Sequence, residues 1–142
     1  MLLLLKLKTF HLLYLFKELK RFYMAKQKAF KKEKYQEGLI KEISLIFRTE
    51  IKDSRLTFIS ITKVELNSDY SVAKVYWDTF DASKRGDAKK ALENVAGKVR
   101  SLLASRLKAR HTPLIEFHYD SQFESEKKID ALLSPNSRKG DS

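Results

Sequence analysis

An apolar stripe in residues 88–107 is the feature that most constrains the fold of this 142-residue chain. Its members recur every three or four positions, which places them on one side of an α-helix. Gly97 falls in the middle of the stripe, and a mid-helix glycine costs about 1 kcal/mol relative to alanine. We therefore expect two helices that meet in a kink at Gly97. The stripe consists of Ala88, Ala91, Leu92, Val95, Val99, Leu102, Leu103 and Leu107.

The chain on either side of this stripe alternates between helical and extended patterns. Residues 35–51 repeat apolar side chains at steps of three and four, which predicts another helix with one buried face. Residues 56–66 and 71–78 are rich in β-branched and aromatic side chains. Because the turn between them is short, we expect an antiparallel hairpin. Residues 114–119 are predicted to form a third strand.

This order of elements predicts an α+β fold. It runs helix, strand, strand, helix, kink, helix, strand, and a short helix near Ile129–Leu133 closes it. A three-stranded sheet with helices packed on one face satisfies the order. The polar loop at 81–87 precedes the long helical segment, where Ser83 or Asp87 is expected to act as the N-cap.

Residues 1–23 differ in composition from the rest, being mostly Leu, Phe, Tyr and Lys. Lys6 and Lys8 interrupt the apolar run, which is too short to cross a bilayer, and no small-residue cleavage site follows. An amphipathic helix on a membrane surface is one interpretation. The favoured interpretation is that residues 1–23 are an extension that results from a start codon assigned too far upstream, because Met24 begins a sequence typical of a protein N-terminus.

We therefore divide the chain into four segments. The extension at 1–23 is followed by a flexible basic arm at 24–34. A folded domain is predicted at 35–133. Residues 134–142 are rich in Pro, Asn, Ser and Gly and are predicted to form a disordered tail.

The charge of the chain favours an anionic partner. It has 29 Lys and Arg against 18 Asp and Glu, a net charge of +11, which points to nucleic acid first and acidic membrane second. Residues 84–110 contain nine bases and two acids, a net charge of +7. A face that only confers solubility usually mixes both signs, so we interpret this segment as a phosphate-binding surface.

Several classes of function are excluded or disfavoured. The absence of cysteine excludes disulfides, thiol catalysis and zinc or iron–sulfur sites with cysteine ligands. The four glycines are too far apart to form a phosphate-binding loop, which disfavours a nucleotide-dependent enzyme. His11, His111 and His118 show no metal-ligand spacing.

A small nuclease is a further alternative, because two carboxylates flank the end of a predicted strand. Asp78 and Asp81 would have to act as an acid–base pair, whereas a solvated turn is the simpler interpretation. The strand aromatics Tyr76, Trp77 and Tyr119 are assigned to packing rather than to base stacking. We expect no catalytic residue, no metal and no cofactor.

Several separated blocks together resemble the bacterial ribosome-binding factor A family. The resemblance runs from about Met24 to Leu133 and is specific because the blocks occur in the right order. They are Glu50–Leu56, Val64–Leu66 with Asp69, Ala73–Tyr76, Ala96–Gly97 with Arg100 and Leu103, Pro113–Leu114 with Phe117, Tyr119 and Asp120, and Ile129 with Leu132–Leu133.

The resemblance implies a type II KH-like domain that binds the free 30S subunit. It further implies help in late maturation and 5′-end processing of 16S rRNA, no enzymatic activity, and a cytoplasmic monomer without cofactor. In place of the GXXG loop of ordinary KH domains, the family has a helix–kink–helix with an Ala-X-Gly signature. Val95, Ala96 and Gly97 occupy that signature, with valine in place of the alanine, and Ser54 stands where proline is usual.

The rRNA-binding residues are predicted to be basic side chains that contact phosphates and so position the protein without reading sequence. If about five phosphates are contacted, a plot of the logarithm of the RNA association constant against the logarithm of the salt concentration should have a slope of roughly −3.5 to −4.5. The alternative is a protein bound to the membrane surface through residues 1–23 and the basic arm. The predicted residues are Lys98, Arg100, Arg106, Lys108 and Arg110 near the kink, Arg55, and Lys26, Lys28, Lys31 and Lys32 in the arm.

Overall fold

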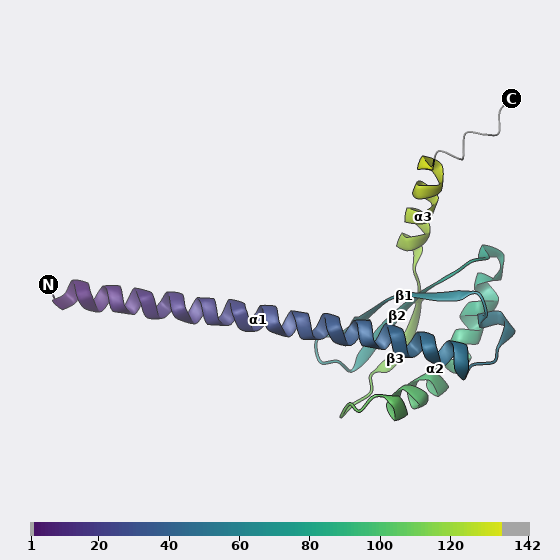
Figure 1. Ribbon diagram of the computed structural model, residues 1–142, viewed down its shortest axis with the longest axis horizontal. Coiled ribbons are helices and arrows are strands. Elements are labelled where there is room, and N and C mark those ends of the chain that lie inside the picture. Colours follow the sequence, from purple (N-terminus) through teal and green to yellow (C-terminus); the bar gives the residue numbers. More distant parts are fainter. Residues whose placement is uncertain (1, 135–142) are drawn as a thin grey trace. The chain divides into compact units, whose positions relative to one another are not determined.

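The computed structural model describes residues 2–134 (Figure 1). The chain divides into two compact units, residues 1–35 and residues 36–142, and each is described by itself. The boundary lies beside residue 35, where the sequence predicts that the folded domain begins. The tail predicted at 134–142 lies outside the described residues, apart from Ser134.

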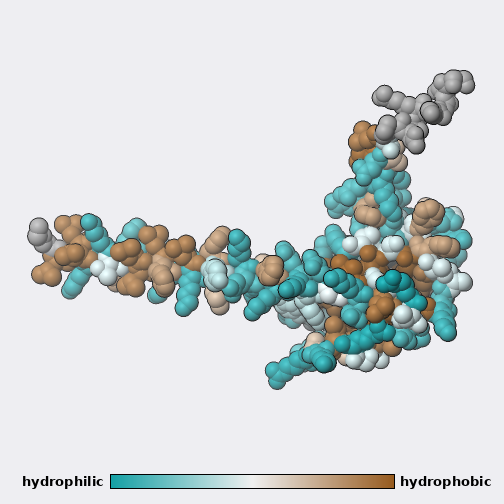
Figure 2. Space-filling view, in the orientation of Figure 1, coloured by the Kyte–Doolittle hydropathy of each residue, from teal (hydrophilic) through white to brown (hydrophobic). Residues whose placement is uncertain are grey.

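Helix α1 spans Leu2–Thr49 and so begins far upstream of the predicted start at residue 35. The segment 24–34, predicted to be a flexible arm, is helical. No glycine or proline precedes Gly38, and Leu, Lys, Glu and Gln all favour a helix, so nothing interrupts it. In the unit 1–35 the apolar side chains remain exposed, as Leu3 and Phe10 illustrate, and hydrophobic and hydrophilic residues alternate along the visible face (Figure 2).

Although these apolar side chains are exposed, α1 is not a membrane-spanning helix. Among the described residues, no helix combines the length and the apolarity needed to cross a bilayer. The lysines that interrupt the leucine and phenylalanine residues keep the mean hydropathy too low.

The unit 36–142 contains a three-stranded sheet in the order β1-β2-β3. Strands β1 (Ile59–Leu66) and β2 (Val72–Thr79) pair antiparallel, as predicted for a hairpin. Strand β3 (Leu114–Tyr119) has its predicted bounds and pairs parallel to β2. A parallel neighbour requires a crossover, which the helix between β2 and β3 provides. The predicted α+β fold is confirmed.

The predicted start of the first strand at residue 56 is wrong by three residues. A short 3-10 turn, η1 (Ser54–Leu56), precedes β1. Its N-cap is Asp53, whose carboxylate accepts a hydrogen bond from the Arg55 backbone N–H at 3.0 Å. A capped turn of this kind competes with an extended backbone, and so it delays the strand until Ile59.

The core lies on one face of the sheet, between the strands and two helices. Trp77 of β2 is 1% exposed and packs edge-to-face against Tyr119 of β3, with ring centroids 5.1 Å apart. The same face receives the C-terminal part of α1 and the helix α2 (Arg85–Arg106), as predicted for helices on a single face. The fully buried helix residues are Leu39, Ile43 and Ile46 from α1 and Ala91, Leu92, Val99 and Leu103 from α2.

Helix α2 is one continuous helix, so the predicted division into two helices at Gly97 is wrong. The ribbon of α2 changes direction along its length, so the predicted bend is present within one helix (Figure 1). Gly97 does not have a positive φ. Its cost of about 1 kcal/mol is smaller than the roughly 1.5–3 kcal/mol gained by burying each large apolar side chain on either side, such as Leu92 and Leu103.

The capping prediction for this helix is also wrong. Neither Ser83 nor Asp87 caps α2, which follows Lys84 without a side-chain cap. Instead, Asp81 caps the short 3-10 turn η2 (Ala82–Lys84) by accepting hydrogen bonds from the Ser83 N–H and hydroxyl at 3.0 and 2.6 Å. That turn leads directly into the helix.

The closing helix α3 (Ser121–Leu133) begins well before the predicted position near Ile129. Asp120 is its N-cap and is 7% exposed. The Asp120 carboxylate accepts hydrogen bonds from the Phe123 backbone N–H at 2.9 Å and from the Thr62 hydroxyl at 2.6 Å. Burial raises the pKa of Asp120, but these hydrogen bonds outweigh burial and bring the pKa below its ordinary value.

The core assignment predicts the effect of truncating a leucine of α2. Leu92→Ala should lower the free energy of unfolding by about 2–5 kcal/mol, because a fully buried side chain leaves a cavity. Leu114→Ala, at a position that is 45% exposed, should cost about 1 kcal/mol or less. Urea unfolding measures both, and equal losses would contradict the assigned core.

The cap of α3 predicts a pH dependence. Because the folded pKa of Asp120 is lowered, its carboxylate stabilises the fold above the ordinary value of 3.8, and the stabilisation is lost as the pH falls through the folded pKa. Wild type should exceed Asp120→Asn in unfolding free energy by a constant amount above about pH 5, and the gap should shrink under acid conditions. A gap that is unchanged down to about pH 3 would refute this role.

Candidate nucleic-acid interface

Two of the predicted phosphate ligands lie on opposite flanks of α2. Lys98 donates to the Glu50 carbonyl at 3.4 Å, and Arg100 donates to the Thr112 carbonyl at 3.3 Å. Positions two apart on a helix are separated by about 200°, which explains why they diverge. Both side chains are exposed. Since their partners are neutral carbonyls, both keep a full positive charge that can attract an anion.

Arg106 does not belong to the exposed set. It follows Leu103 by three residues and Val99 by seven, so it continues the buried side of the helix. Its guanidinium is 2.9 Å from the Glu50 carboxylate and 3.9 Å from that of Glu42, and its side chain is 26% exposed. Arg106 therefore joins the end of α2 to α1, and two carboxylates compensate its charge. Its contact with phosphate stays a prediction.

Lys108 and Arg110 lie beyond the end of α2, in the segment that leads to β3. Both are exposed. Within the described part of the chain, neither forms a salt bridge. Lys89 and Lys90 are also exposed on α2 and add two bases that the site prediction omitted.

Arg55 is already paired with a carboxylate. Its Nε and Nη2 atoms lie 3.0 and 2.7 Å from the two oxygens of Asp53. This side-chain hydrogen bonding lowers the pKa of Asp53. The pair fixes the turn η1 and compensates the arginine charge. The prediction that Arg55 contacts phosphate stays a prediction.

The four predicted lysines of the arm belong to the helical unit 1–35. Lys26, Lys28 and Lys31 are exposed, whereas Lys32 is half-buried. No salt bridge is formed by any of the four within residues 2–134. This unit holds ten bases and two acids, a net charge of +8.

The folded unit is nearly neutral overall but strongly polarised. Residues 36–134 contain 17 bases and 15 acids, a net charge of +2. The segment 84–110 alone carries +7, which leaves −5 on the remaining residues of the unit. A polyanion is therefore attracted to α2 and the segment after it, and it is repelled by the rest of the unit.

The strand aromatics are not free for stacking. Trp77 and Tyr119 belong to the core, as predicted. Tyr76 lies on the other face of the sheet, where its hydroxyl donates to Glu65 at 3.2 Å and its ring lies beneath Lys63 and 5.8 Å from the ring of His118. These contacts already occupy the ring.

Asp78 and Asp81 do not form an acid–base pair. Asp78 is only 3% exposed, so the interpretation of a solvated turn is wrong for this residue. Its carboxylate pairs with Lys127 of α3 and accepts a hydrogen bond from the Tyr119 hydroxyl at 3.3 Å. Asp81 serves as the cap of η2. Among the described residues, no group of three or more His, Cys, Asp or Glu side chains is placed to bind a metal.

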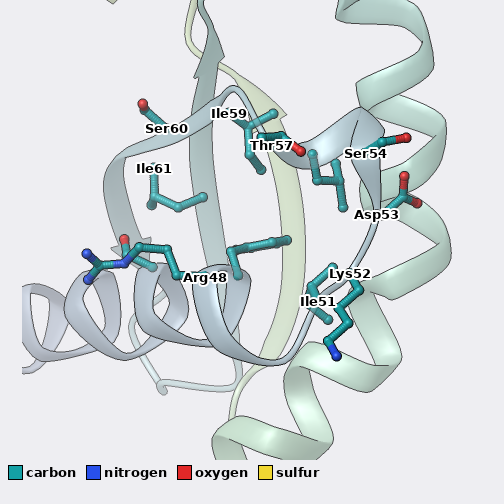
Figure 3. Close-up of a pocket in the computed structure, with 12 residues that line it drawn as sticks. Arg48, Ile51, Lys52, Asp53, Ser54, Thr57, Ile59, Ser60 and Ile61 are labelled. Atoms are coloured by element: carbon teal, nitrogen blue, oxygen red, sulfur yellow. The ribbon is translucent and has the colours of Figure 1, made fainter.

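A cavity of about 620 Å³ lies where the end of α1 meets the start of β1 (Figure 3). Arg48 and Lys52 contribute positive charge, and Asp53 is committed to Arg55. The lining contains no histidine, and its one carboxylate is the Asp53 already bound to Arg55. The lining residues are Ser44, Phe47, Arg48, Ile51, Lys52, Asp53, Ser54, Leu56, Thr57, Ile59, Ser60 and Ile61.

The reassignment of Arg106 is testable by unfolding. Arg106→Gln should lower the unfolding free energy by about 1 kcal/mol, the upper end for a partly exposed pair, and the loss should shrink in about 1 M NaCl. Lys108→Gln removes the same charge without an intramolecular ion pair and should change stability by less than about 0.5 kcal/mol. Indistinguishable unfolding curves for the two variants would contradict the structural role.

Comparisons with known proteins agree with this architecture. The sequence profile described as ribosome-binding factor A matches residues 31–133. A ribosome-binding factor A from Syntrophomonas wolfei is 39% identical over 106 residues, which cover 72% of this chain and 87% of that protein. Another from Halothermothrix orenii is 41% identical over 98 residues, covering 68% and 80% respectively.

A solved structure extends the likeness to three dimensions. The crystal structure of ribosome-binding factor A from Thermus thermophilus matches with a TM-score of 0.57 and 26% identity, covering 62% of this chain and 94% of that one. The KH-like fold expected from the sequence is thereby confirmed. On the strength of the match over residues 31–133, the chain belongs to the ribosome-binding factor A family.

Proposed function

We propose that this protein is a ribosome assembly factor that binds the free 30S subunit and assists late maturation and 5′-end processing of 16S rRNA. The observation that carries the proposal is the family match, which spans residues 31–133 and so includes both α2 and the basic segment after it. The relatives that match are named for binding the ribosome. We place the protein in the cytoplasm, as a monomer, on this basis.

The physical basis is the set of uncompensated positive charges at the C-terminal end of α2. This α2 basic set consists of Lys98, Arg100, Lys108 and Arg110, all exposed. Phosphate contacts of this kind orient a protein on RNA without reading bases. With about four contacts in place of five, the expected log–log salt slope becomes roughly −2.8 to −3.6.

Gly97 supports contact between the backbone of α2 and the RNA. A Cβ atom at this position would meet nothing within 4 Å, so no packing inside the chain requires glycine. Glycine permits close approach of another molecule to the helix backbone. We assign Val95, Ala96 and Gly97 to the contact region, with the half-buried Val95 and Ala96 fixing the helix against the sheet.

Binding without turnover fits the chemistry of the described residues. The two carboxylates at the end of β2 are already engaged: Asp78 pairs with Lys127, and Asp81 caps η2. The proposed action is therefore to hold rRNA in one arrangement while other factors process it. Neither the family match nor the relatives quoted above support the alternative of a membrane-surface protein.

The proposal predicts loss of subunit binding when the α2 basic set is neutralised. A variant with Lys98, Arg100, Lys108 and Arg110 changed to Gln should no longer co-sediment with free 30S subunits in a sucrose gradient. The magnitude of its RNA salt slope should fall by about one for each contact removed. Cells that depend on it should accumulate 16S precursor with an unprocessed 5′ end.

A matched control removes the same charge elsewhere in the folded unit. Changing Lys41, Lys52, Lys63 and Lys74 to Gln should leave co-sedimentation and 16S processing close to wild type. If wild type stays at the top of the gradient, the proposed function is wrong. If both variants bind equally well, the assigned surface is wrong.

A further inference from the structure

Two phenylalanines of the folded unit are exposed although both are large apolar side chains. Phe58 is 57% exposed and Phe80 is 91% exposed. A buried phenylalanine stabilises a fold by about 1.5–3 kcal/mol, and Phe80 contributes almost none of this. An exposed aromatic pair is more typical of an interaction site than of a scaffold.

The two phenylalanines lie next to each other in space, 22 positions apart in the sequence. The Phe80 backbone N–H donates to the Phe58 carbonyl at 3.2 Å, directly beyond the last β1–β2 pair, Ile59 with Thr79. Residues opposite each other on antiparallel strands have neighbouring side chains. The two exposed phenylalanines therefore extend from adjoining backbone positions at the open end of the hairpin.

A cation flanks the pair and is fixed there by a capped turn. Lys84 Nζ lies 5.8 Å from the centre of the Phe58 ring. Lys84 ends the turn η2, whose cap Asp81 accepts two hydrogen bonds from Ser83. The turn connects Phe80 to Lys84 and so fixes the backbone that carries both residues. Lys89 and Lys90 follow on the exposed side of α2.

We infer that Phe58, Phe80 and Lys84 form a stacking platform for an unpaired nucleobase of the RNA partner. A base has an apolar face that stacks on an aromatic ring, and its phosphate is attracted to a nearby ammonium group. Residues 80–90 contain four bases and two acids. Arg85 is paired with Glu124 at 3.7 Å, and Lys84, Lys89 and Lys90 remain exposed, which favours an anionic partner over an apolar pocket on a protein. The inference rests on the proposed function for the identity of the RNA.

The platform is separate from the α2 basic set. It lies at the start of α2, whereas Lys98, Arg100, Lys108 and Arg110 lie at and beyond its C-terminal half. The basic set attracts any phosphate chain, single- or double-stranded. The platform accepts only a base that is free to unstack, so it gives a preference for single-stranded RNA.

The test measures binding of the full chain to a labelled ten-nucleotide oligoadenylate and to a blunt-ended RNA duplex by fluorescence polarisation. Phe80→Ala should weaken binding of the single strand about 5- to 150-fold, the range for one stacked base. Duplex binding should change less than twofold. Phe80→Tyr should retain binding, and Phe80→Leu, which is apolar without an aromatic ring, should not.

Leu114→Ala is the control for the loss of an apolar surface side chain, since Leu114 is 45% exposed. It should bind both probes as wild type does. Equal single-strand affinity of wild type and Phe80→Ala would overturn the inference. So would a loss of 30S co-sedimentation in Phe80→Ala and Phe80→Tyr with unchanged oligoadenylate binding, because a protein surface would then be the partner.

The two proposals fail in distinguishable ways. A wild-type protein that does not co-sediment with 30S subunits refutes the proposed function, whatever the oligonucleotides show. If the wild-type protein co-sediments and Phe80→Ala binds the single strand as tightly as wild type, only the stacking platform is refuted.

Discussion

Packing of α2 against the sheet around Trp77 is the interaction on which the rest of the structure depends. It buries Leu92, Val99 and Leu103 completely, and a helix with one side buried must present the other to solvent. The same packing lets α2 serve as the crossover that brings β3 alongside β2. Burial of an apolar stripe thus decides which lysines and arginines face outward.

The charges of the folded unit follow from this packing rather than from composition. Arg106 lies on the buried side of α2 and pairs with Glu50 and Glu42, whereas Lys108 and Arg110 extend beyond the helix end. The result is a unit of small net charge whose positive charge is gathered on one segment. Such polarity orients a polyanion as well as attracting it.

Much of the fold could be predicted from the sequence, because local patterns determine it. The third strand matches its predicted bounds at Leu114–Tyr119, and the hairpin pairs as its short turn requires. The continuity of α2 could not be predicted, since the cost of Gly97 must be weighed against burial that only the tertiary structure shows. The partly buried position of Arg106 was signalled by its spacing from Leu103. The exposure of Phe80 had no such signal, because Phe80 lies between the predicted strand at 71–78 and the predicted loop at 81–87.

The central claim is that RNA meets this protein along α2 and the segment after it. Ultraviolet crosslinking of the protein on 30S particles purified from cells, with mass spectrometry of the crosslinked peptides, tests it most directly. The account predicts RNA adducts on peptides from residues 84–110 and few on the opposite face of the sheet. Adducts confined to Lys63, Lys74 and their neighbours on that face would contradict it.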